Sequence, residues 1–449
     1  MKITLIGASE GVTGSCTLLE TKNEKYIIDC GMYQGGTDAR QKNSADFGFD
    51  PREIKAVFLT HAHLDHCGLL PRIVKEGFAG QVYCTLPTKD MAEVVLLDAA
   101  KIAKEDAKYE EVEPLYDEDD VAVLMSYFVG KQYHEQFDTG SLHVKFWDAG
   151  HILGSAIVEI FDGEKKVVFS GDLGNYPVLL LNKPDLLDGA ADVLVMESTY
   201  GDRVHEDVYM RKLILREAVC KALGNGGVVM IPAFAMERTQ ELLYVFNDFA
   251  EREKMCRGMI YLDSPMASKI TEIFKKYASY LNEEARWFLA TENDLFDFPH
   301  LKITDTVQES KEINADTSPK VIIAGSGMMN GGRIRHHMKK YLPDEKSVLF
   351  VVGYQVEGTL GRQILDGAKK VRILGEEVEV AAQVMAVGAF SAHADRNRIL
   401  QWIAAMAEMP KKVVLNHGEE SAKVSLQEKI NSTLRTECVV PKKGEIIEV

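Results

Sequence analysis

Hydrophobic and polar positions along the chain follow two patterns, one typical of β-strands and one typical of α-helices. Short runs of β-branched and aromatic residues, bounded by turn residues, are separated by longer segments with apolar residues at helical spacing. The short runs before Tyr200 predict strands at residues 2–8, 25–29, 56–60, 81–85, 142–149, 166–172 and 192–198.

Two helices are expected among these strands. Residues 90–108 have Met91, Val95 and Ile102 on one side, which predicts an amphipathic helix. A second helix is expected to begin in the segment DEDDVAVLMSYF, residues 117–128. Its acids at 117–120 could be a metal cluster, but acids complement the dipole of a helix N-terminus, and that interpretation is favoured.

From about residue 202 the texture changes to strands that alternate regularly with helices, which favours a parallel sheet in an α/β domain. One helix there has Leu242, Val245, Phe246 and Phe249 on one face. The last segment returns to the first style, so an inserted domain fits better than domains in tandem. We expect a first domain at 1–202, an inserted domain at 203–370, and the rest of the first domain at 371–449.

Composition sets bounds on the protein class. A chain of 449 residues with 46% hydrophobic residues is long enough for about two or three domains. No apolar run approaches the ~20 residues of a membrane span. No export signal is visible, and the 7 cysteines form no CxxC pair, so we expect reduced thiols and a cytoplasmic protein. The net charge of −16 argues against a broad nucleic-acid-coating surface but permits one positive cleft.

The densest chemistry lies in the segment HAHLDH at residues 61–66, which holds three of the chain's 12 histidines. Side chains two apart in an extended segment point the same way, so His61 and His63 can bind one ion. Asp65 and His66 follow after the chain turns and can face a second ion. We therefore predict a strand that ends just before this segment and a metal-binding loop after it.

A dinuclear site needs further ligands, and strand ends are where side chains converge. His151 follows the run LHVKFWDAG, Asp172 ends KVVFSGD, and His417 follows KVVLN. A carboxylate has two oxygens and can bridge two ions, so Asp172 is placed to do so. Imidazole and carboxylate ligands suit zinc, with manganese as the alternative. Cys67 could also be a ligand, but a small buried thiol is favoured because His and Asp already fill the ligand set.

At this point the chain resembles the metallo-β-lactamase fold and, more narrowly, its β-CASP branch, which contains RNA-processing nucleases such as ribonuclease J and the cleavage and polyadenylation endonuclease subunit. The resemblance rests on motifs along the whole chain, among them HAHLDH, PAFAMERTQELL, YLDSPMA and GSGMMNGGR. In the order of the family's motifs, the matching residues are Asp29, the HAHLDH segment, His151, Asp172, Glu197, His393 and His417.

The resemblance implies a role for each matching residue. Asp29 would orient a ligand. One ion would be held by His61, His63, His151 and Asp172, and the other by Asp65, His66, Asp172 and His417. The expected catalytic residues are Asp65, Glu197 and His393.

The mechanism expected from such a site is phosphodiester hydrolysis. Two ions about 3.5–4 Å apart would hold a bridging water and lower its pKa toward neutrality. The resulting hydroxide would attack phosphorus in line with the leaving oxygen, while both ions offset the developing charge. His393 is the candidate to protonate the leaving 3′-oxygen, and Glu197 would orient it and keep it charged.

Several other segments have two interpretations. In GSGMMNGGR, the backbone around Gly327, with Ser326 and Arg333, could bind phosphate, or the segment could be an ordinary strand-to-helix turn. Arg238 could face the cleft or the surface. The basic run 333–340 could follow a nucleic-acid backbone or be a solvated helix face. GASEGVTGS is expected to be a turn near the site entrance, and no metal role is expected for His134, His143, His205, His300, His336 and His337.

We therefore expect an α/β protein with an αββα metallo-β-lactamase sandwich and an inserted α/β β-CASP domain. The expected function is hydrolysis of single-stranded RNA with two Zn²⁺, as an endonuclease, a 5′-exonuclease or both. A DNA nuclease, an ester or thioester hydrolase and a scaffold that has lost activity are the alternatives. In the DNA-acting members of the branch that the chain resembles, the position of His417 tends to carry an apolar residue, so the resemblance favours RNA over DNA. We expect no membrane partner and a short stand-alone form, and a homodimer is left open.

Overall fold

The structure is a computed structural model, and it describes residues 1–35, 38–110, 112–205, 208–252, 258–291, 294–353, 355–387 and 391–449. The chain forms two compact units. Unit 1 comprises Met1–Tyr176, Leu181–Val204 and His393–Val449, and unit 2 comprises Pro177–Leu180 and His205–Ala392.

Unit 1 contains two seven-stranded sheets. The first has the order β22 (Ile446–Glu448), β1 (Lys2–Leu5), β2 (Cys16–Glu20), β3 (Lys25–Cys30), β4 (Ile54–Phe58), β5 (Gln81–Thr85) and β6 (Phe128–Lys131). The second has the order β21 (Glu437–Val439), β20 (Lys412–Leu415), β11 (Val193–Met196), β10 (Lys166–Phe169), β9 (Ala156–Phe161), β8 (Leu142–Asp148) and β7 (Gln136–Thr139).

The two sheets face each other across one apolar core. Side chains from the first sheet, such as Phe58, and from the second, such as Phe146 and Val167, belong to a single buried cluster. Alternate residues of the second sheet, such as Val168, point to the opposite face and pack with Trp402. The central strand β11, with the sequence VLVM, buries both of its faces and is therefore a continuous hydrophobic run.

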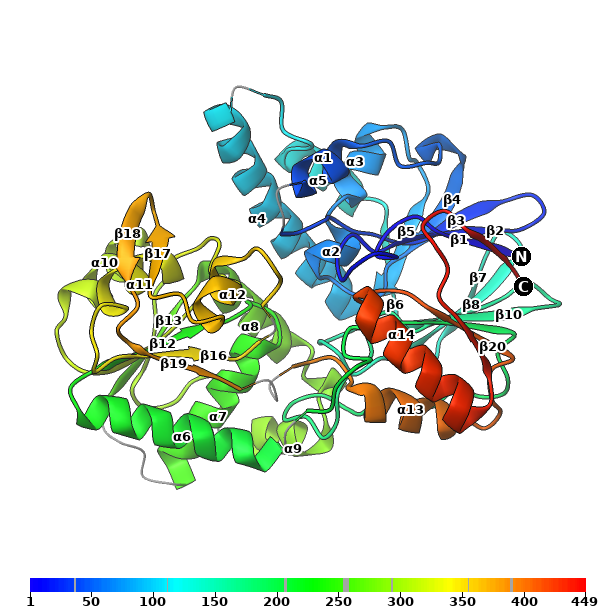
Figure 1. Ribbon diagram of the computed structural model, residues 1–449. Coiled ribbons are helices and arrows are strands. Elements are labelled where there is room, and N and C mark those ends of the chain that lie inside the picture. The colour runs from blue at the N-terminus through cyan, green and yellow to red at the C-terminus, as the bar shows by residue number, and fades with distance from the viewer. Residues whose placement is uncertain are drawn as a thin grey trace. The chain divides into compact units, whose positions relative to one another are not determined.

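Helices cover the outer faces of both sheets, which makes the unit an αββα sandwich. Figure 1 shows α13 and α14 beside β20, and their apolar residues join the outer cluster of the second sheet. The helices of unit 1 are α1 (Ala39–Ser44), α2 (Leu64–Cys67), α3 (Leu70–Lys75), α4 (Leu86–Glu110), α5 (Glu118–Met125), α13 (Arg396–Ala404) and α14 (Glu420–Lys429).

Strand direction gathers the loops that carry the predicted ligands. In the first sheet β3, β4 and β5 are parallel neighbours, and in the second β10, β11 and β20 are parallel neighbours. The carboxyl ends of parallel strands lie at the same edge of a sheet. The residues that follow each of these strands therefore meet, although they are far apart in sequence.

Unit 2 is an open parallel sheet with helices on both faces (Figure 1). Its strand order is β14 (Leu301–Ile303), β13 (Met259–Asp263), β15 (Lys320–Ala324), β12 (Val228–Pro232), β16 (Val348–Val351) and β19 (Gln383–Ala386), and a separate hairpin pairs β17 (Lys370–Ile373) with β18 (Glu376–Glu379). Its helices are α6 (Val208–Gly224), α7 (Arg238–Arg252), α8 (Pro265–Lys276), α9 (Glu283–Thr291), α10 (Val307–Ala315), α11 (Ile334–Tyr341) and α12 (Leu360–Leu365).

The expected fold class, a sandwich with an inserted α/β domain, is confirmed. The sequence predicted that the inserted domain ends at residue 370. In the structure unit 2 continues to Ala392, because β19 pairs with β16 of the unit 2 sheet. Ile102 was placed wrongly on the buried side of its helix, since it is exposed. The acids at 117–120 do serve a helix start, because Asp117 caps α5 and accepts hydrogen bonds from the backbone N–H groups of Asp119 and Asp120.

Two further expectations concern membranes and thiols. None of the described helices combines the length and the apolar character that a membrane span requires. Among the residues that the structure describes, five cysteines are free and buried: Cys16, Cys30, Cys67, Cys84 and Cys438. Cys220 is disulfide-bonded, so the expectation of reduced thiols is wrong at that position.

Candidate metal centre

The HAHLDH segment leaves β4 in extended conformation and turns into the short helix α2 at Leu64. Asp29, at the end of β3, fixes the start of this turn from the neighbouring strand. Its Oδ1 accepts a hydrogen bond from Thr60 N at 2.7 Å, and its Oδ2 accepts one from Thr60 Oγ1 at 2.8 Å and lies 2.7 Å from His66 Nδ1. With Nδ1 bound to Asp29, the ring of His66 presents Nε2 to the centre, as expected for an acid that orients a ligand.

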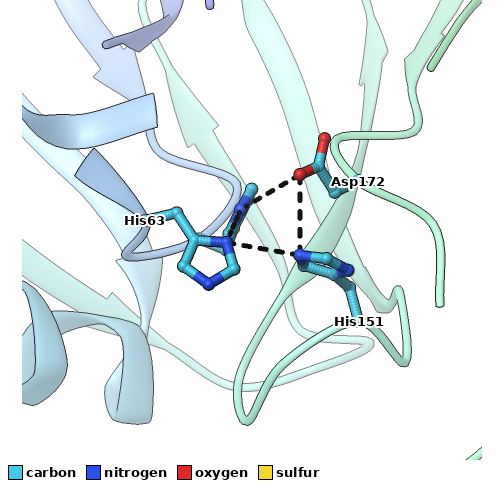
Figure 2. Close-up of side chains that lie close together, drawn as sticks. His63, His151 and Asp172 are labelled. Atoms are coloured by element: carbon cyan, nitrogen blue, oxygen red, sulfur yellow. Dashed lines mark hydrogen bonds and ion pairs between the residues drawn. The ribbon is translucent and has the colours of Figure 1, made fainter. Parts of the chain in front are cut away.

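A first group of donor atoms is formed by His61, His63, His151 and Asp172. His63 Nδ1 lies 3.0 Å from His61 Nε2 and 3.3 Å from His151 Nε2. Asp172 Oδ2 lies 3.5 Å from both His61 Nε2 and His151 Nε2. Figure 2 shows His63, His151 and Asp172 directed toward one another from separate segments.

A second group is formed by Asp65, His66 and His417. His417 Nε2 lies 3.5 Å from Asp65 Oδ2 and 3.3 Å from His66 Nε2. Asp172 Oδ1 lies 3.4 Å from His66 Nε2 and 3.5 Å from His417 Nδ1. Asp172 thus presents one carboxylate oxygen to each group, which is the arrangement that a bridging ligand requires.

The charges of the first donor group suit cation binding. Burial, helped by neighbouring imidazoles, holds the pKa of His61 and that of His151 well below the usual value, and burial lowers the pKa of His63 to about 4. These three rings are therefore neutral, the form that binds a metal. Burial would raise the pKa of Asp172, but the surrounding imidazoles, His417 foremost, hold it well below the usual value, so this carboxylate is ionised.

The geometry fits metal ions better than a hydrogen-bond network. Ligands at about 2.0–2.1 Å from a tetrahedral zinc ion lie about 3.3 Å from one another, close to the separations above. Asp172 Oδ1 and His151 Nδ1 are buried, and neither has a hydrogen-bond partner among the described residues. A buried carboxylate oxygen without a donor is costly, and a cation would remove that cost.

Glu197 and His393 form a pair beside the first group. His393 Nδ1 lies 3.1 Å from both oxygens of Glu197 and 3.8 Å from Asp172 Oδ2. Glu197 is buried and its Oε1 also accepts a hydrogen bond from Leu173 N at 2.6 Å. Burial would lower the pKa of His393, but Glu197 and then Asp172 outweigh it and raise that pKa to about 9.

Backbone contacts that hold the donors in place were not visible in the sequence. In the GASEGVTGS loop, Ser15 N donates to Asp65 O at 2.7 Å, and Ala8 O accepts from His417 N at 3.0 Å. A Cβ at Gly31 would lie 1.6 Å from Asp65 O, so only glycine permits this approach. The loop expected near the site entrance thus holds the backbone of two donors, Asp65 and His417, and Gly31, outside that loop, permits the close approach of Asp65.

Other expectations for unit 1 have clear outcomes. Cys67 is fully buried, its Sγ–H donates to Ala62 O at 3.5 Å, and burial raises the pKa of its thiol well above the usual value. These observations favour the buried thiol over the ligand. His134 and His143 pair with Asp185 and Asp138.

In unit 2, the GSGMMNGGR segment forms the turn between β15 and α11. Ser326 Oγ accepts from Gly331 N at 3.2 Å, and Gly327 O accepts from Gln355 Nε2 at 3.0 Å. Arg333 donates from Nη1 to Asp263 Oδ1 at 2.7 Å and from Nη2 to Asp305 O at 2.7 Å. Two nitrogens of the guanidinium are therefore engaged within unit 2, and the phosphate contact stays a prediction.

Two basic features of unit 2 are less exposed than the sequence suggested. Arg238 is buried and donates to Glu241, so a surface role is wrong. In the basic run, His337 and Met338 are buried on one face of α11, while Lys339 pairs with Glu376 at 2.6 Å. The run is thus an amphipathic helix with partners inside its own unit.

Comparison with known proteins agrees with the fold. Family models match along the chain: the metallo-beta-lactamase superfamily at residues 10–202, the Beta-Casp domain at 239–364 and the Zn-dependent metallo-hydrolase RNA specificity domain at 377–441. A solved structure titled as a protein of unknown function from Enterococcus faecalis V583 covers 99% of both chains with a TM-score of 0.57 and 13% identity, and shows the fold alone.

Among curated proteins, Ribonuclease TTHA0252 of Thermus thermophilus is 40% identical over 95% of both chains. The RNase J-like protein of Methanocaldococcus jannaschii is 31% identical over 99% of this chain and 98% of its own length. Integrator complex subunit 11 of Danio rerio is 32% identical over 99% of this chain and 73% of its own length. The chain belongs to the β-CASP branch of the metallo-β-lactamase superfamily.

Proposed function

We propose that this chain is a metal-dependent ribonuclease that hydrolyses phosphodiester bonds of single-stranded RNA. The observation that carries the proposal is the division of donors around Asp172, whose two oxygens face two separate groups of imidazoles. The names of the ribonuclease and RNase J-like relatives support RNA as the substrate.

The proposed ligands follow the two groups. One cation would be held by His61, His63, His151 and Asp172, and the other by Asp65, His66, Asp172 and His417. We propose zinc, because imidazole and carboxylate donors at these separations suit it, with manganese as the alternative. When bound, a pair of such ions lowers the pKa of water and offsets charge on phosphoryl oxygens.

The residues of the chain would supply the rest of the chemistry. His393 would donate a proton to the leaving 3′-oxygen as the P–O bond breaks. The proposal assigns that proton to Nε2, because Nδ1 faces Glu197. Glu197 would orient the ring and keep it protonated, since it raises the pKa of His393.

The proposed partner is single-stranded RNA in the cytoplasm. Ser326, Gly327 and Arg333 are proposed contacts of RNA phosphates. A homodimer stays a prediction that a measurement of the molar mass in solution would test.

The test is digestion of a 5′-labelled single-stranded RNA beside a DNA of matched sequence. We compare the wild-type protein with Asp172→Ala and with the exposed control Asp138→Ala, whose carboxylate lies 2.7 Å from His143 Nδ1. We expect cleavage of RNA by the wild type and the control, and none by Asp172→Ala. Mononucleotides alone would mean a 5′-exonuclease, and a ladder an endonuclease.

Other outcomes would select the alternatives. Preferred cleavage of DNA would replace the substrate in the proposal. Cleavage of neither strand, together with hydrolysis of a thioester, would favour a small-molecule hydrolase. Full RNA cleavage by Asp172→Ala would refute the proposed site.

The proton donor has its own test. We expect Glu197→Gln to lower kcat for RNA by about 10–100-fold, because the amide no longer favours the charged ring of His393. The metal content should stay close to that of the wild type. An unchanged kcat would remove Glu197 from the proposal.

A further inference from the structure

The carboxylate of Asp148 has no part in the donor groups, yet it lies close to one of them along the chain. Asp148 is the last residue of β8 and is 9% exposed. Its Oδ1 accepts a hydrogen bond from Gly150 N at 2.8 Å, and its Oδ2 accepts one from Asn182 Nδ2 at 3.3 Å. One carboxylate therefore ties the end of β8 to the turn that follows it and to a distant loop.

The backbone of Asp148 is bound to the same loop. Asp148 N donates to Asp185 Oδ2 at 2.8 Å, and Asp185 N donates to Asp148 O at 2.9 Å. Asp185 is itself held, because His134 Nε2 lies 2.8 Å from its Oδ2. The position of Asp148 is therefore fixed from several sides.

The turn that Asp148 holds leads directly to His151. Gly150 has a φ of +63°, and a Cβ on it would lie 2.7 Å from Asn182 O. On the other side, a Cβ at Gly174 would lie 2.0 Å from Gly150 O. His151 N then donates to Ser155 Oγ at 3.0 Å. These close approaches leave the turn little room to shift, so the hydrogen bonds of Gly150 N and His151 N help to fix where the His151 ring points.

We propose that Asp148 is a positioning residue for His151: through the hydrogen bond to Gly150 N it sets the turn that directs His151 Nε2 into the first donor group. The inference rests on the proposed metal-binding function. It adds a residue that contacts neither metal nor substrate.

A buried carboxylate is a costly way to close a turn. Burial, opposed by the hydrogen bonds from Gly150 and Asn182, raises the pKa of Asp148 to about 7, and Asp185 adds to the rise. A neutral side chain that merely capped the strand would avoid this cost. The cost is consistent with a need for an acceptor oxygen at one fixed place, next to Gly150 N.

The test measures metal affinity in the full chain. We compare the wild-type protein with Asp148→Ala, which removes the acceptor, Asp148→Asn, which keeps an acceptor oxygen, and the exposed control Asp138→Ala. Metal-free protein is titrated with zinc against a chromophoric chelator, and folding of each variant is checked by circular dichroism and thermal unfolding.

We expect Asp148→Ala to weaken binding at one of two sites by about 10–100-fold, as seen when a residue that orients a ligand is lost. We expect Asp148→Asn to stay within about 3-fold of the wild type and the control to be unchanged, since the asparagine oxygen still accepts from Gly150 N. If Asp148→Ala does not fold, Asp148→Glu replaces it. That variant keeps the charge but moves the oxygens, and the same weakening is expected.

The possible failures are distinguishable. A folded Asp148→Ala or Asp148→Glu that binds zinc like the wild type would overturn the inference and leave the proposed function intact. Asp148→Asn weakened as much as Asp148→Ala would also overturn it, because an acceptor oxygen beside Gly150 N would then not be enough to position His151. A wild-type chain that binds no zinc would overturn the proposed zinc centre together with this inference.

Discussion

Two buried aspartates, Asp172 in unit 1 and Asp263 in unit 2, look alike in the sequence but differ in their surroundings. Each follows or ends a strand, and each has at least one histidine beside its carboxylate. Around Asp263 every contact is a short hydrogen bond: Oδ1 accepts from Thr304 Oγ1 at 2.8 Å and from Arg333 Nη1 at 2.7 Å, and Oδ2 accepts from Ser310 Oγ at 2.6 Å and lies 2.7 Å from His337 Nε2.

Around Asp172 the imidazole nitrogens stand back at 3.4–3.8 Å. Such distances are too long for good hydrogen bonds. The carboxylate of Asp263 is thus fully hydrogen-bonded and stabilises unit 2. The carboxylate of Asp172 lacks such short hydrogen bonds. Both carboxylates are buried and both have histidine neighbours. What separates the structural cluster from the candidate metal centre is whether short hydrogen bonds satisfy the carboxylate oxygens.

The largest expected effect comes from the same isosteric change at both positions. Asp172→Asn should lower kcat/KM for single-stranded RNA by about 10⁴-fold, because an amide cannot serve both donor groups. Asp263→Asn should change it by less than about 3-fold in protein that remains folded, because that carboxylate belongs to a structural network. Steady-state cleavage of a labelled RNA measures both, and equal losses would break the comparison.

For stability, in contrast to activity, we expect the larger effect at Asp263. Asp263→Ala should lower the free energy of unfolding by about 3–5 kcal/mol, since Arg333 would lose its buried partner. Asp172→Ala in metal-free protein should cost less, because few short hydrogen bonds are lost there. Urea unfolding of both metal-free variants measures the difference, and a larger loss for Asp172→Ala would contradict the assignment.

Removal of metal sharpens the comparison further. If the donor groups bind zinc, free zinc at 100 times the dissociation constant stabilises the fold by about 2.7 kcal/mol. A chelator should therefore lower the melting temperature of the wild type and of Asp263→Asn alike. It should leave Asp172→Ala nearly unaffected, and a chelator effect of equal size in all three proteins would point to a metal elsewhere.

The smallest effect is a pH dependence of stability. Burial acts to raise the pKa of Asp263, but the hydrogen bonds from His337, Ser310 and Arg333 lower it to about 2. A carboxyl with a lowered pKa contributes stability that is present above its unfolded value and lost as pH falls toward 2. The stability difference between the wild type and Asp263→Asn should therefore narrow by about 2 kcal/mol between pH 5 and pH 2. Urea unfolding across this range measures it, and a constant difference would contradict the charged network.

Much of the candidate site could be predicted, because its donors come in recognisable types at strand ends. HAHLDH, His151, Asp172 and His417 were found from spacing and strand position, and the structure brings them together. Their supports were not found. Gly31 and Ser15 approach the backbone of Asp65, which is distant in sequence, and no local pattern reports such contacts. The role proposed for Asp148 rests on the hydrogen bond from Gly150 N, which shows only once the turn is folded.

Charged residues of unit 2 were harder to place for a related reason. A basic residue in a sequence gives no sign of whether a carboxylate will meet it. Arg238 is buried against Glu241, and Arg333 is engaged by Asp263. The predicted domain boundary at 371 differs from the observed one because β19 is an edge strand of the unit 2 sheet. It pairs in parallel with β16, and the residues next to β19 in the sequence do not reveal that pairing.

The insertion of unit 2 sets an order of events during synthesis. When the ribosome has finished Val204, β11 has no β20 beside it and His417 does not yet exist. Translation of His205–Ala392 then takes about 10–40 s at ~5–20 residues per second. During that interval the edge of β11 is open to wrong partners, and the nascent chain lacks His417 of the second donor group. Nuclease competence should therefore appear only after His417 has been synthesised and β20 has paired with β11.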